Sequence, residues 1–194
     1  MRAAIWENCR ILLQTMNPVN QLQQILSSHP EAFSSERELK RNEYLKVKGT
    51  TDTNLYLVKS GCLRVFMEDE FEEHTIRFGY QGNFIAALDS YISEKPSPFY
   101  IQAIRQTELS VITKQDFDRL IQSNPEYLKV WQQILGLLIY QQLEREVDIL
   151  TYSPAERYRR VLERSPQLFQ EVPAKYIASY LRMTPETLSR LKKS

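Results

Sequence analysis

The sequence predicts an α+β protein in which an antiparallel β-roll precedes a long helix and a small helical C-terminal domain. Three observations predict this order: apolar residues alternate with polar ones over 44–113, an apolar helical segment follows over 125–150, and the last 44 residues read as short helices rich in basic side chains. We expect an N-terminal helical and β-roll domain over residues 1–120, the long helix within 121–150, and the C-terminal domain over 151–194.

The composition is that of a globular protein. Of the 194 residues, 42% are hydrophobic and 25% are charged, which allows one or two domains with a real core. Cys9 and Cys62 lie far apart, which excludes a disulfide framework and a four-thiolate cluster. No apolar run approaches the ~18 residues of a membrane span, and Glu7, Asn8 and Arg10 interrupt any signal-peptide core. We therefore expect a cytoplasmic protein.

The net charge of +1 conceals a strong asymmetry along the chain. Residues 151–194 carry nine Lys or Arg against four Glu, a net charge of +5, whereas residues 1–150 carry a net charge of −4. A basic segment attached to an acidic body is the electrostatic pattern expected of a nucleic-acid-binding protein. By itself this pattern is a weak signal, because a net charge of +5 over 44 residues can also belong to an ordinary solvated surface.

The first 43 residues have the spacing of helices. Asn17-Pro18 ends one amphipathic segment, and a second follows it. We expect residues 1–15 to be an extension with a minor role, because Met16 resembles a protein start. The apolar residues that share a face are Ile5, Trp6, Cys9, Leu12 and Leu13 in the first segment, and Leu22, Ile25 and Leu26 in the second.

From Tyr44 to Thr113 the period of apolar residues changes to two, which is typical of strands. Short alternating runs are separated by Ser60-Gly61 and Gln81-Gly82-Asn83, and the acidic stretch 68–73 predicts an exposed hairpin tip. Strands at this spacing favour an antiparallel roll or barrel.

A long helix is predicted from Asn124-Pro125 to about Leu150. Of the 24 residues over 127–150, 14 are apolar, which is too many for the surface of a monomer. We infer that this helix packs both on its own β-roll and on a second subunit, giving a homodimer. The alternative is a helix buried between two domains of one chain.

The last 23 residues have the pattern of a helix-turn-helix. Val172-Pro173 precedes a short helix over 174–180, and a tight turn over 181–183 leads to Thr184, which caps a second helix beginning at Pro185. Upstream, Ser153-Pro154 begins a further helix that ends at Ser165-Pro166.

The chemistry of the second helix suits contact with DNA. Glu186 and Arg190 lie one turn apart; arginine can pair bidentately with guanine, and glutamate can accept from the cytosine amino group. Thr184 and the backbone N–H groups of the first turn suit phosphate. The competing interpretation is a surface i,i+4 ion pair worth about 0.2–0.5 kcal/mol. The predicted DNA contacts are Lys175, Thr184, Pro185, Glu186, Thr187, Ser189, Arg190, Lys192 and Lys193.

Over residues 16–194 the chain resembles the Crp–Fnr family of bacterial transcription regulators, in wording like that of its Bacteroidetes-type branch. The resemblance is carried by Asn54–Val65, Gly82–Phe84, Val172–Leu181 and Thr184–Arg190. It implies a cyclic nucleotide-binding-like sensor roll (a double-stranded β-helix), a dimerisation helix, and a homodimer on a pseudo-palindromic site in double-stranded DNA. It also implies RNA polymerase as a further partner and an unidentified small-molecule effector.

The sensor departs from the family pattern where a cyclic nucleotide would bind. Ile85-Ala86 replaces the Gly-Glu that holds the ribose, and Ser97-Pro98 replaces the phosphate-binding Arg, with Lys95 the nearest basic residue. Losing both groups removes the charged anchor for the phosphate, so we expect cyclic AMP not to be the effector. The candidate effector-pocket residues are Phe84, Ile85, Ala86, Ala87, Ser97, Pro98, Phe99 and Tyr100.

Other features argue against further chemistry. The cysteine set of oxygen-sensing relatives is missing, and the sequence ends at Ser194, where many relatives add a β wing, so we expect weaker DNA affinity. His29 and His74 belong to no triad or metal motif. We expect no enzyme activity, no catalytic residue, no metal and no cofactor.

Two alternatives from other classes remain. One is a small-molecule sensor whose helix-turn-helix has lost DNA binding, which the missing wing favours and the basic C-terminal segment opposes. The other is a protein-interaction module that uses apolar faces of the roll. Salt-dependent binding to any duplex separates both from a regulator.

Overall fold

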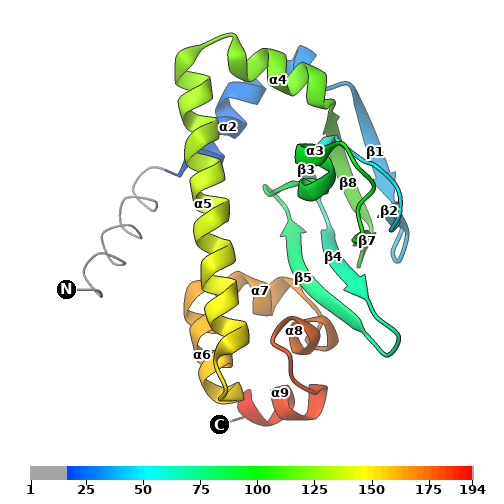
Figure 1. Cartoon of the computed structure of the whole chain (residues 1–194), viewed down its shortest axis with the longest axis vertical. Coiled ribbons are helices and arrows are strands. Elements are labelled where there is room, and N and C mark those ends of the chain that lie inside the picture. The colour runs from blue at the N-terminus through cyan, green and yellow to red at the C-terminus, as the bar shows by residue number, and fades with distance from the viewer. Residues whose placement is uncertain (1–16, 194) are drawn as a thin grey trace, which may run out of the picture.

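The computed structural model describes residues 17–193, so Cys9 and the helix expected over residues 1–15 lie outside the described residues. A single long helix runs the length of the molecule, with the β-roll beside its upper half and the C-terminal helices beside its lower half (Figure 1). The helices are α2 (Pro18–Ser27), η1 (Pro30–Ala32), α3 (Leu88–Ser93), α4 (Lys114–Gln122), α5 (Pro125–Leu150), α6 (Pro154–Arg164), α7 (Pro166–Glu171), α8 (Ala174–Tyr180) and α9 (Pro185–Leu191). The strands are β1 (Ser35–Leu39), β2 (Tyr44–Lys46), β3 (Leu55–Ser60), β4 (Cys62–Glu68), β5 (Glu73–Tyr80), β6 (Phe84–Ile85), β7 (Tyr100–Ala103) and β8 (Thr107–Ile112).

The strands form two four-stranded antiparallel sheets, in the orders β1-β8-β3-β6 and β2-β7-β4-β5. The inward residues of both sheets form the roll core, which includes Leu63, Ile101 and Leu109. Gly61 makes the tight turn between β3 and β4 with φ 91°, and a Cβ there would lie 2.3 Å from the Gln106 carbonyl oxygen. The predicted α+β class with an antiparallel roll is therefore confirmed.

The prediction of helix throughout residues 1–43 is wrong for Ser35–Leu39. These residues form the edge strand β1, which pairs with β8 from Ser35↔Val111 to Leu39↔Thr107. Only Leu39 of this strand is buried. Neither helical nor alternating periodicity is therefore visible in the segment, and its strand conformation comes from pairing with a distant partner.

A second core joins the helices to the upper end of the roll. This helical core contains Leu22 and Leu26 from α2, Phe117 from α4 and Ile134 from α5. The helix α5 begins as the sequence predicts, because the Asn124 side chain accepts a hydrogen bond from the Glu126 N–H at 2.9 Å and Pro125 occupies the first turn. It then extends well beyond the helical core toward the C-terminal helices.

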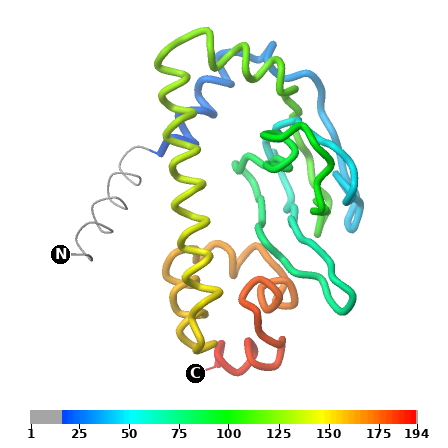
Figure 2. Tube along the Cα trace, viewed as in Figure 1, coloured from blue at the N-terminus to red at the C-terminus, as the bar shows by residue number. Residues whose placement is uncertain are grey.

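A third core connects the C-terminal helices to the roll. In this shared core, Cys62 and Ile104 of the roll pack with buried residues of α6, α7, α8 and α9, including Val161, Ile177 and Leu188. The tube in Figure 2 shows the β4–β5 hairpin descending beside α8. The C-terminal helices are thus held between the hairpin and the lower half of α5.

Candidate functional site

The helices α8 and α9 form two short segments joined by a tight turn. Ile177, Leu181 and Leu188 are fully buried and pack with Val161 of α6, which fixes the angle between the two helices. In the turn, the Met183 N–H donates to the Ala178 carbonyl at 3.1 Å, and Arg182 has φ 53°. The Thr184 hydroxyl accepts from the Thr187 N–H at 3.2 Å and caps α9.

Eight of the nine predicted DNA contacts have exposed side chains. Thr187 is half-buried, and its hydroxyl lies 3.2 Å from the Thr184 hydroxyl, so these two groups are paired with each other. The helix α9 forms the lower end of the molecule, away from the roll (Figure 1). The exposed residues, which we call the reading surface, are Lys175, Thr184, Pro185, Glu186, Ser189, Arg190, Lys192 and Lys193.

Glu186 and Arg190 are free to engage a ligand. Within residues 17–193 no hydrogen bond or ion pair joins the Glu186 side chain to that of Arg190, and the Glu186 carboxylate hydrogen-bonds only with the Thr184 side chain and the backbone at the start of α9. The pKa of Glu186 lies below its ordinary value because its carboxylate accepts hydrogen bonds from its own backbone N–H and from the Thr184 side chain, with a smaller contribution from the Arg190 charge. Glu186 is therefore an ionised acceptor beside an available guanidinium donor.

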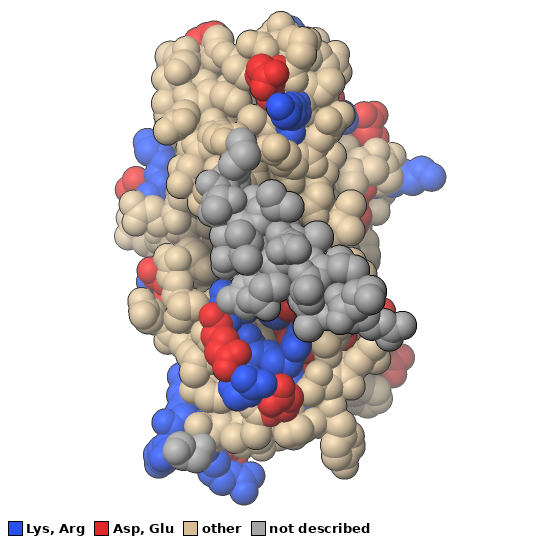
Figure 3. All heavy atoms as spheres, turned by 90° about the vertical axis from the view of Figure 1, so that its left-hand side faces the viewer, with Lys and Arg blue, Asp and Glu red and all other residues tan. Residues whose placement is uncertain are grey.

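The lysines of the reading surface lie against aromatic rings. The Lys175 Nζ is 4.5 Å from the centre of the Tyr176 ring, and the Lys192 Nζ is 5.9 Å from that of Phe169. Both ammonium groups remain exposed. Figure 3, turned so that the α5 side faces the viewer, shows Lys and Arg gathered over the lower half of the molecule, where the C-terminal helices lie.

Buried ion pairs fasten these helices to α5. Asp148 is fully buried and accepts from the Arg160 Nε at 3.0 Å and from Arg164. Glu144, one turn earlier, accepts from Arg164 at 3.2 Å. Removing one member of a buried pair leaves the other charge uncompensated, so this cluster sets the direction in which α6 leaves α5.

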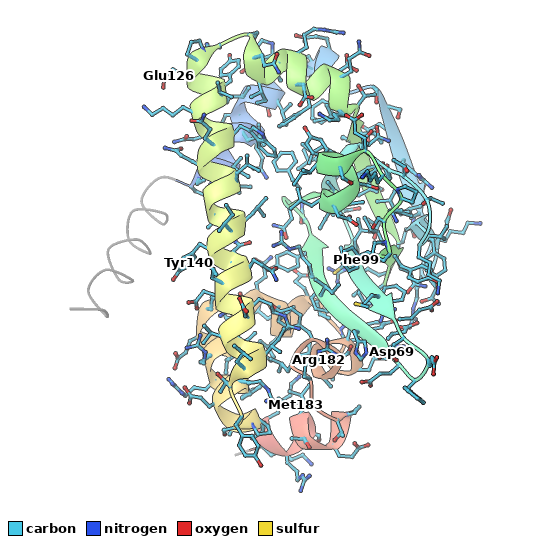
Figure 4. All side chains as sticks on the ribbon, in the orientation of Figure 1. Asp69, Phe99, Glu126, Tyr140, Arg182 and Met183 are labelled. Carbon is cyan, nitrogen blue, oxygen red and sulfur yellow. The ribbon has the colours of Figure 1, made fainter. Side chains whose placement is uncertain are left out.

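The β4–β5 hairpin contacts α8 and the following turn. The Ser179 hydroxyl donates to the Glu73 carbonyl at 2.9 Å and accepts from the Thr75 N–H at 3.1 Å. The Arg182 guanidinium contacts His74, whose other ring nitrogen lies 2.5 Å from an Asp69 oxygen. Figure 4 labels Arg182 and Asp69 on the two sides of this contact. That hydrogen bond and two backbone N–H groups lower the pKa of Asp69.

The predicted effector-pocket residues do not gather around one cavity. Phe84, Ile85 and Ala86 line a cleft of about 600 Å³ between α5 and the roll. Ala87 is buried in the roll core. The other four residues belong to the segment that follows α3 and enters β7.

In that second group, Ser97 is buried and its hydroxyl accepts from the Phe99 N–H at 3.1 Å. Pro98 is exposed, and Phe99 packs against the roll core. The Tyr100 ring stacks on Phe66 with centroids 4.9 Å apart, and its hydroxyl donates to Glu68 at 2.6 Å. The side chains of Ser97, Phe99 and Tyr100 are therefore engaged in contacts within the protein itself.

A buried lysine near Ser97 was missed by the sequence reasoning. The Lys46 ammonium donates to the carbonyls of Phe99 at 2.8 Å, Val47 at 3.0 Å and Ser97 at 3.4 Å. Burial lowers its pKa, which nearby Asp89 and Asp52 partly offset. Lys46 alternates with apolar residues like any exposed strand lysine, so no signal in the sequence distinguishes it.

The cleft beside α5 also contains residues outside the prediction. Its lining includes Trp131, Ile134 and Leu138 of α5 and Arg77 of β5. Arg145 lies at its lower end, with its Cζ 3.9 Å from the centre of the Tyr180 ring. These residues come from segments that are far apart in the sequence, so no sequence motif indicates that they share one cleft.

The histidines take part in local contacts. His29 hydrogen-bonds to Glu31 at 3.0 Å and to the Tyr127 hydroxyl at 3.2 Å, and His74 belongs to the hairpin contact. Among the described residues, no three His, Cys, Asp or Glu side chains gather in a group that could hold a metal ion. Within residues 17–193, no helix is both long and apolar enough to cross a bilayer.

Comparison with known proteins identifies the roll. Residues 36–124 match the protein family described as cyclic nucleotide-binding domain. No curated protein matches the sequence. The chain is similar in structure to FixK2 from Bradyrhizobium japonicum, with a TM-score of 0.67, 18% identity and 82% of each chain covered.

Two further structures are similar over most of the chain. One is CLP from Xanthomonas campestris, described as a c-di-GMP-responsive global regulator, with a TM-score of 0.64, 15% identity, and coverage of 88% of this chain and 90% of that chain. The other is a CooA mutant from Carboxydothermus hydrogenoformans, with a TM-score of 0.66, 21% identity, and coverage of 84% and 76%. At these identities the likeness establishes a shared fold.

Proposed function

We propose that the chain is a DNA-binding transcription regulator of the Crp–Fnr type, acting as a homodimer on a pseudo-palindromic operator. The observation that carries the proposal is the reading surface. Glu186 and Arg190 are exposed on a capped second helix at the end of the molecule, and among residues 17–193 they form no ion pair with each other. An exposed Glu and Arg one turn apart can read neighbouring bases in a major groove.

The alternative of a surface ion pair is weakened by the same observation, since Glu186 and Arg190 form no ion pair among the described residues. The short α9 is held by Leu188 in the shared core and by the Thr184 cap. The Glu186–Arg190 pair is therefore not needed to hold the helix, and a role in recognition accounts for these two residues better.

The homodimer is supported by the outer side of α5. Ile139, Leu143, Val147 and Leu150 recur at spacings of three and four residues and are exposed, Ile139 by 64% and Leu150 by 75%. Such a stripe in water costs about 25 cal/mol per Å² relative to burial. Two copies packed along this stripe would set two reading surfaces about one turn of DNA, ~34 Å, apart.

In this proposal residues 1–120 form the sensor domain, 121–150 contain the dimerisation helix and 151–194 form the DNA-binding domain. The roll lacks the residues that bind the ribose and the phosphate of a cyclic nucleotide. RNA polymerase is a further partner in this proposal. A sensor that has lost DNA binding is the second candidate, which the cleft of about 600 Å³ between α5 and the roll favours.

The test is selection of duplexes from a random pool by the full chain, followed by binding of the selected duplex and a scrambled duplex across a salt series. We expect affinity to fall linearly on a log–log plot against salt, and the selected duplex to bind about 10³-fold or more tightly than the scrambled one. Failure to retain any duplex at 50 mM salt would reject the regulator in favour of the sensor.

A further inference from the structure

The cleft between α5 and the roll has two chemically different ends. Its upper part is apolar and is lined by Leu22, Leu55, Phe84, Tyr91, Trp131 and Leu138. Its lower part contains four arginines, Arg77, Arg145, Arg160 and Arg164, and only two glutamates, Glu144 and Glu163. An apolar cleft of this size with a few convergent polar groups is the usual form of a small-molecule site.

The arginines of the lower part are not equivalent. Arg160 and Arg164 are neutralised by Asp148 and Glu144, and Glu163 is paired with Arg159. Arg77 differs: within residues 17–193, no hydrogen bond, ion pair or ring contact joins its guanidinium to another residue. A half-buried guanidinium without a partner lowers the stability of the folded protein unless an anion binds to it and compensates its charge.

Arg145 adds a second positive charge to the lower part of the cleft. Its guanidinium lies over the Tyr180 ring and donates to the Thr75 carbonyl at 3.4 Å, two residues before Arg77 on β5. Burial lowers the pKa of both arginines, and both interact electrostatically with Tyr180. The two cations therefore lie in one desolvated region, where an anion would be bound strongly.

The length of the cleft indicates the shape of the ligand. Trp131 and Arg145 both line it and stand fourteen residues apart on α5, which corresponds to about 21 Å along the helix axis. The walls between them carry Ile134, Leu137 and Leu138. A ligand anchored at the arginines and lying along these walls must be apolar over most of its length and negatively charged at one end.

We propose that this cleft binds a carboxylate with a medium-length alkyl chain, with the carboxylate at the end lined by Arg77 and Arg145 and the chain running along Leu138 toward Ile134. The inference that the bound carboxylate is the effector of a transcription regulator rests on the proposed function. The inference that the cleft binds this carboxylate does not. Because Tyr180 belongs to α8, the occupied site touches the DNA-binding helices directly.

The experiment is calorimetric titration of the full chain, without DNA, with decanoate and with decyltrimethylammonium, each below its micelle concentration. We expect one decanoate per chain, and weaker binding of the cationic probe by about tenfold or more, the factor for a lost charge-assisted hydrogen bond. Over octanoate, decanoate and dodecanoate, each methylene should raise the affinity by up to about fourfold. Equal binding of the two decyl probes, or no binding of decanoate, overturns the proposal.

Variants locate the site. Arg77→Gln should weaken decanoate by about tenfold or more, Arg77→Lys should retain most of the affinity, and Arg119→Gln, which removes an exposed arginine of α4, should change nothing. Undiminished decanoate binding by folded Arg77→Gln overturns the assignment. If that variant does not fold, the proposal is tested by comparing the binding of decanoate and decyltrimethylammonium to the unaltered chain. Loss of DNA binding in the separate duplex assay leaves all these outcomes unaffected.

Discussion

The Ser179 hydroxyl lies 3.1 Å from the backbone nitrogen of Thr75, a residue 104 positions earlier in the chain. The same hydroxyl donates to the Glu73 carbonyl. One small side chain on α8 thus provides both the acceptor and the donor that the β4–β5 hairpin requires, and joins the predicted DNA-binding and sensor domains.

Replacing Ser179 with Ala should lower the free energy of unfolding by about 1 kcal/mol, because the Thr75 N–H loses its partner in a partly buried place. Urea denaturation measures the change. Ser189→Ala, at an exposed position of α9, is the matched control and should stay within about 0.5 kcal/mol of the unaltered protein. Equal stabilities of the two variants would show that the hairpin contact contributes nothing.

The dimer is tested by placing charges on the exposed stripe of α5. Ile139→Glu together with Leu143→Glu should give monomers and abolish specific DNA binding, because two buried carboxylates oppose each other across the interface. Leu138 is unsuitable for this purpose, since it packs against the helical core. Light scattering gives the mass, with Gln122→Glu on α4 as control. A stable monomer of the unaltered chain at micromolar concentration would reject the dimer.

Base reading and phosphate contact are separated by two variants of the reading surface. Arg190→Ala should cost ~1–3 kcal/mol per half-site and relax the preference at one base pair. Lys192→Ala should weaken every duplex alike and reduce the salt slope by about one unit. Binding of selected and scrambled duplexes across a salt series measures both effects. If Arg190→Ala leaves the ratio between the duplexes unchanged, the base-reading role is wrong.

Cyclic AMP should not bind with micromolar affinity. The Ala86 side chain has no acceptor for the ribose hydroxyl. Ser97 is buried and its hydroxyl accepts from the Phe99 N–H, while the Lys46 ammonium already donates to three carbonyl groups, so neither is available to a phosphate. A missing charge-assisted anchor weakens binding by roughly 1.5–3 kcal/mol. Calorimetry with cyclic AMP is the measurement. Micromolar binding that Arg77→Gln abolishes would assign the guanidinium to a phosphate and overturn the choice of a carboxylate.

The thiol of Cys62 should be inert in the folded protein. Burial raises its pKa to about 12, so the reactive thiolate is scarce at pH 8.5. In a Cys9→Ser variant, iodoacetamide should label the chain only after unfolding in urea. The unfolded thiol loses its proton above about pH 8.5 while the folded one keeps it, so its contribution to stability falls as the pH rises from there toward 12. Rapid labelling of the native variant would contradict this burial.

Local signals predicted most of the element boundaries. Asn124-Pro125, Ser153-Pro154 and Thr184-Pro185 each begin a helix, because a capping side chain and a proline act within one turn of chain. The exposed hairpin tip between β4 and β5 followed from its run of acidic residues. Such boundaries depend on neighbours in sequence, which a single sequence displays.

Features that depend on distant segments were not predictable. The strand β1 exists through its pairing with β8, and Arg77 gains its role only because α5 and α8 enclose it. The predicted effector residues came from two short runs of the sequence, 84–87 and 97–100, whereas the cleft collects side chains from α2 to α8. Periodicity reports which face of an element is buried and not which element covers it.

The shared core has a consequence for how the chain unfolds. Cys62 and Ile104 from the roll and Val161, Ile177 and Leu188 from the last helices bury one another, so neither part can open without wetting the apolar surface of the other. Heating should therefore melt residues on both sides of Thr151 in one cooperative step. A fragment that ends or begins at that residue would expose its side of the shared core to water, and we expect it to aggregate when expressed alone.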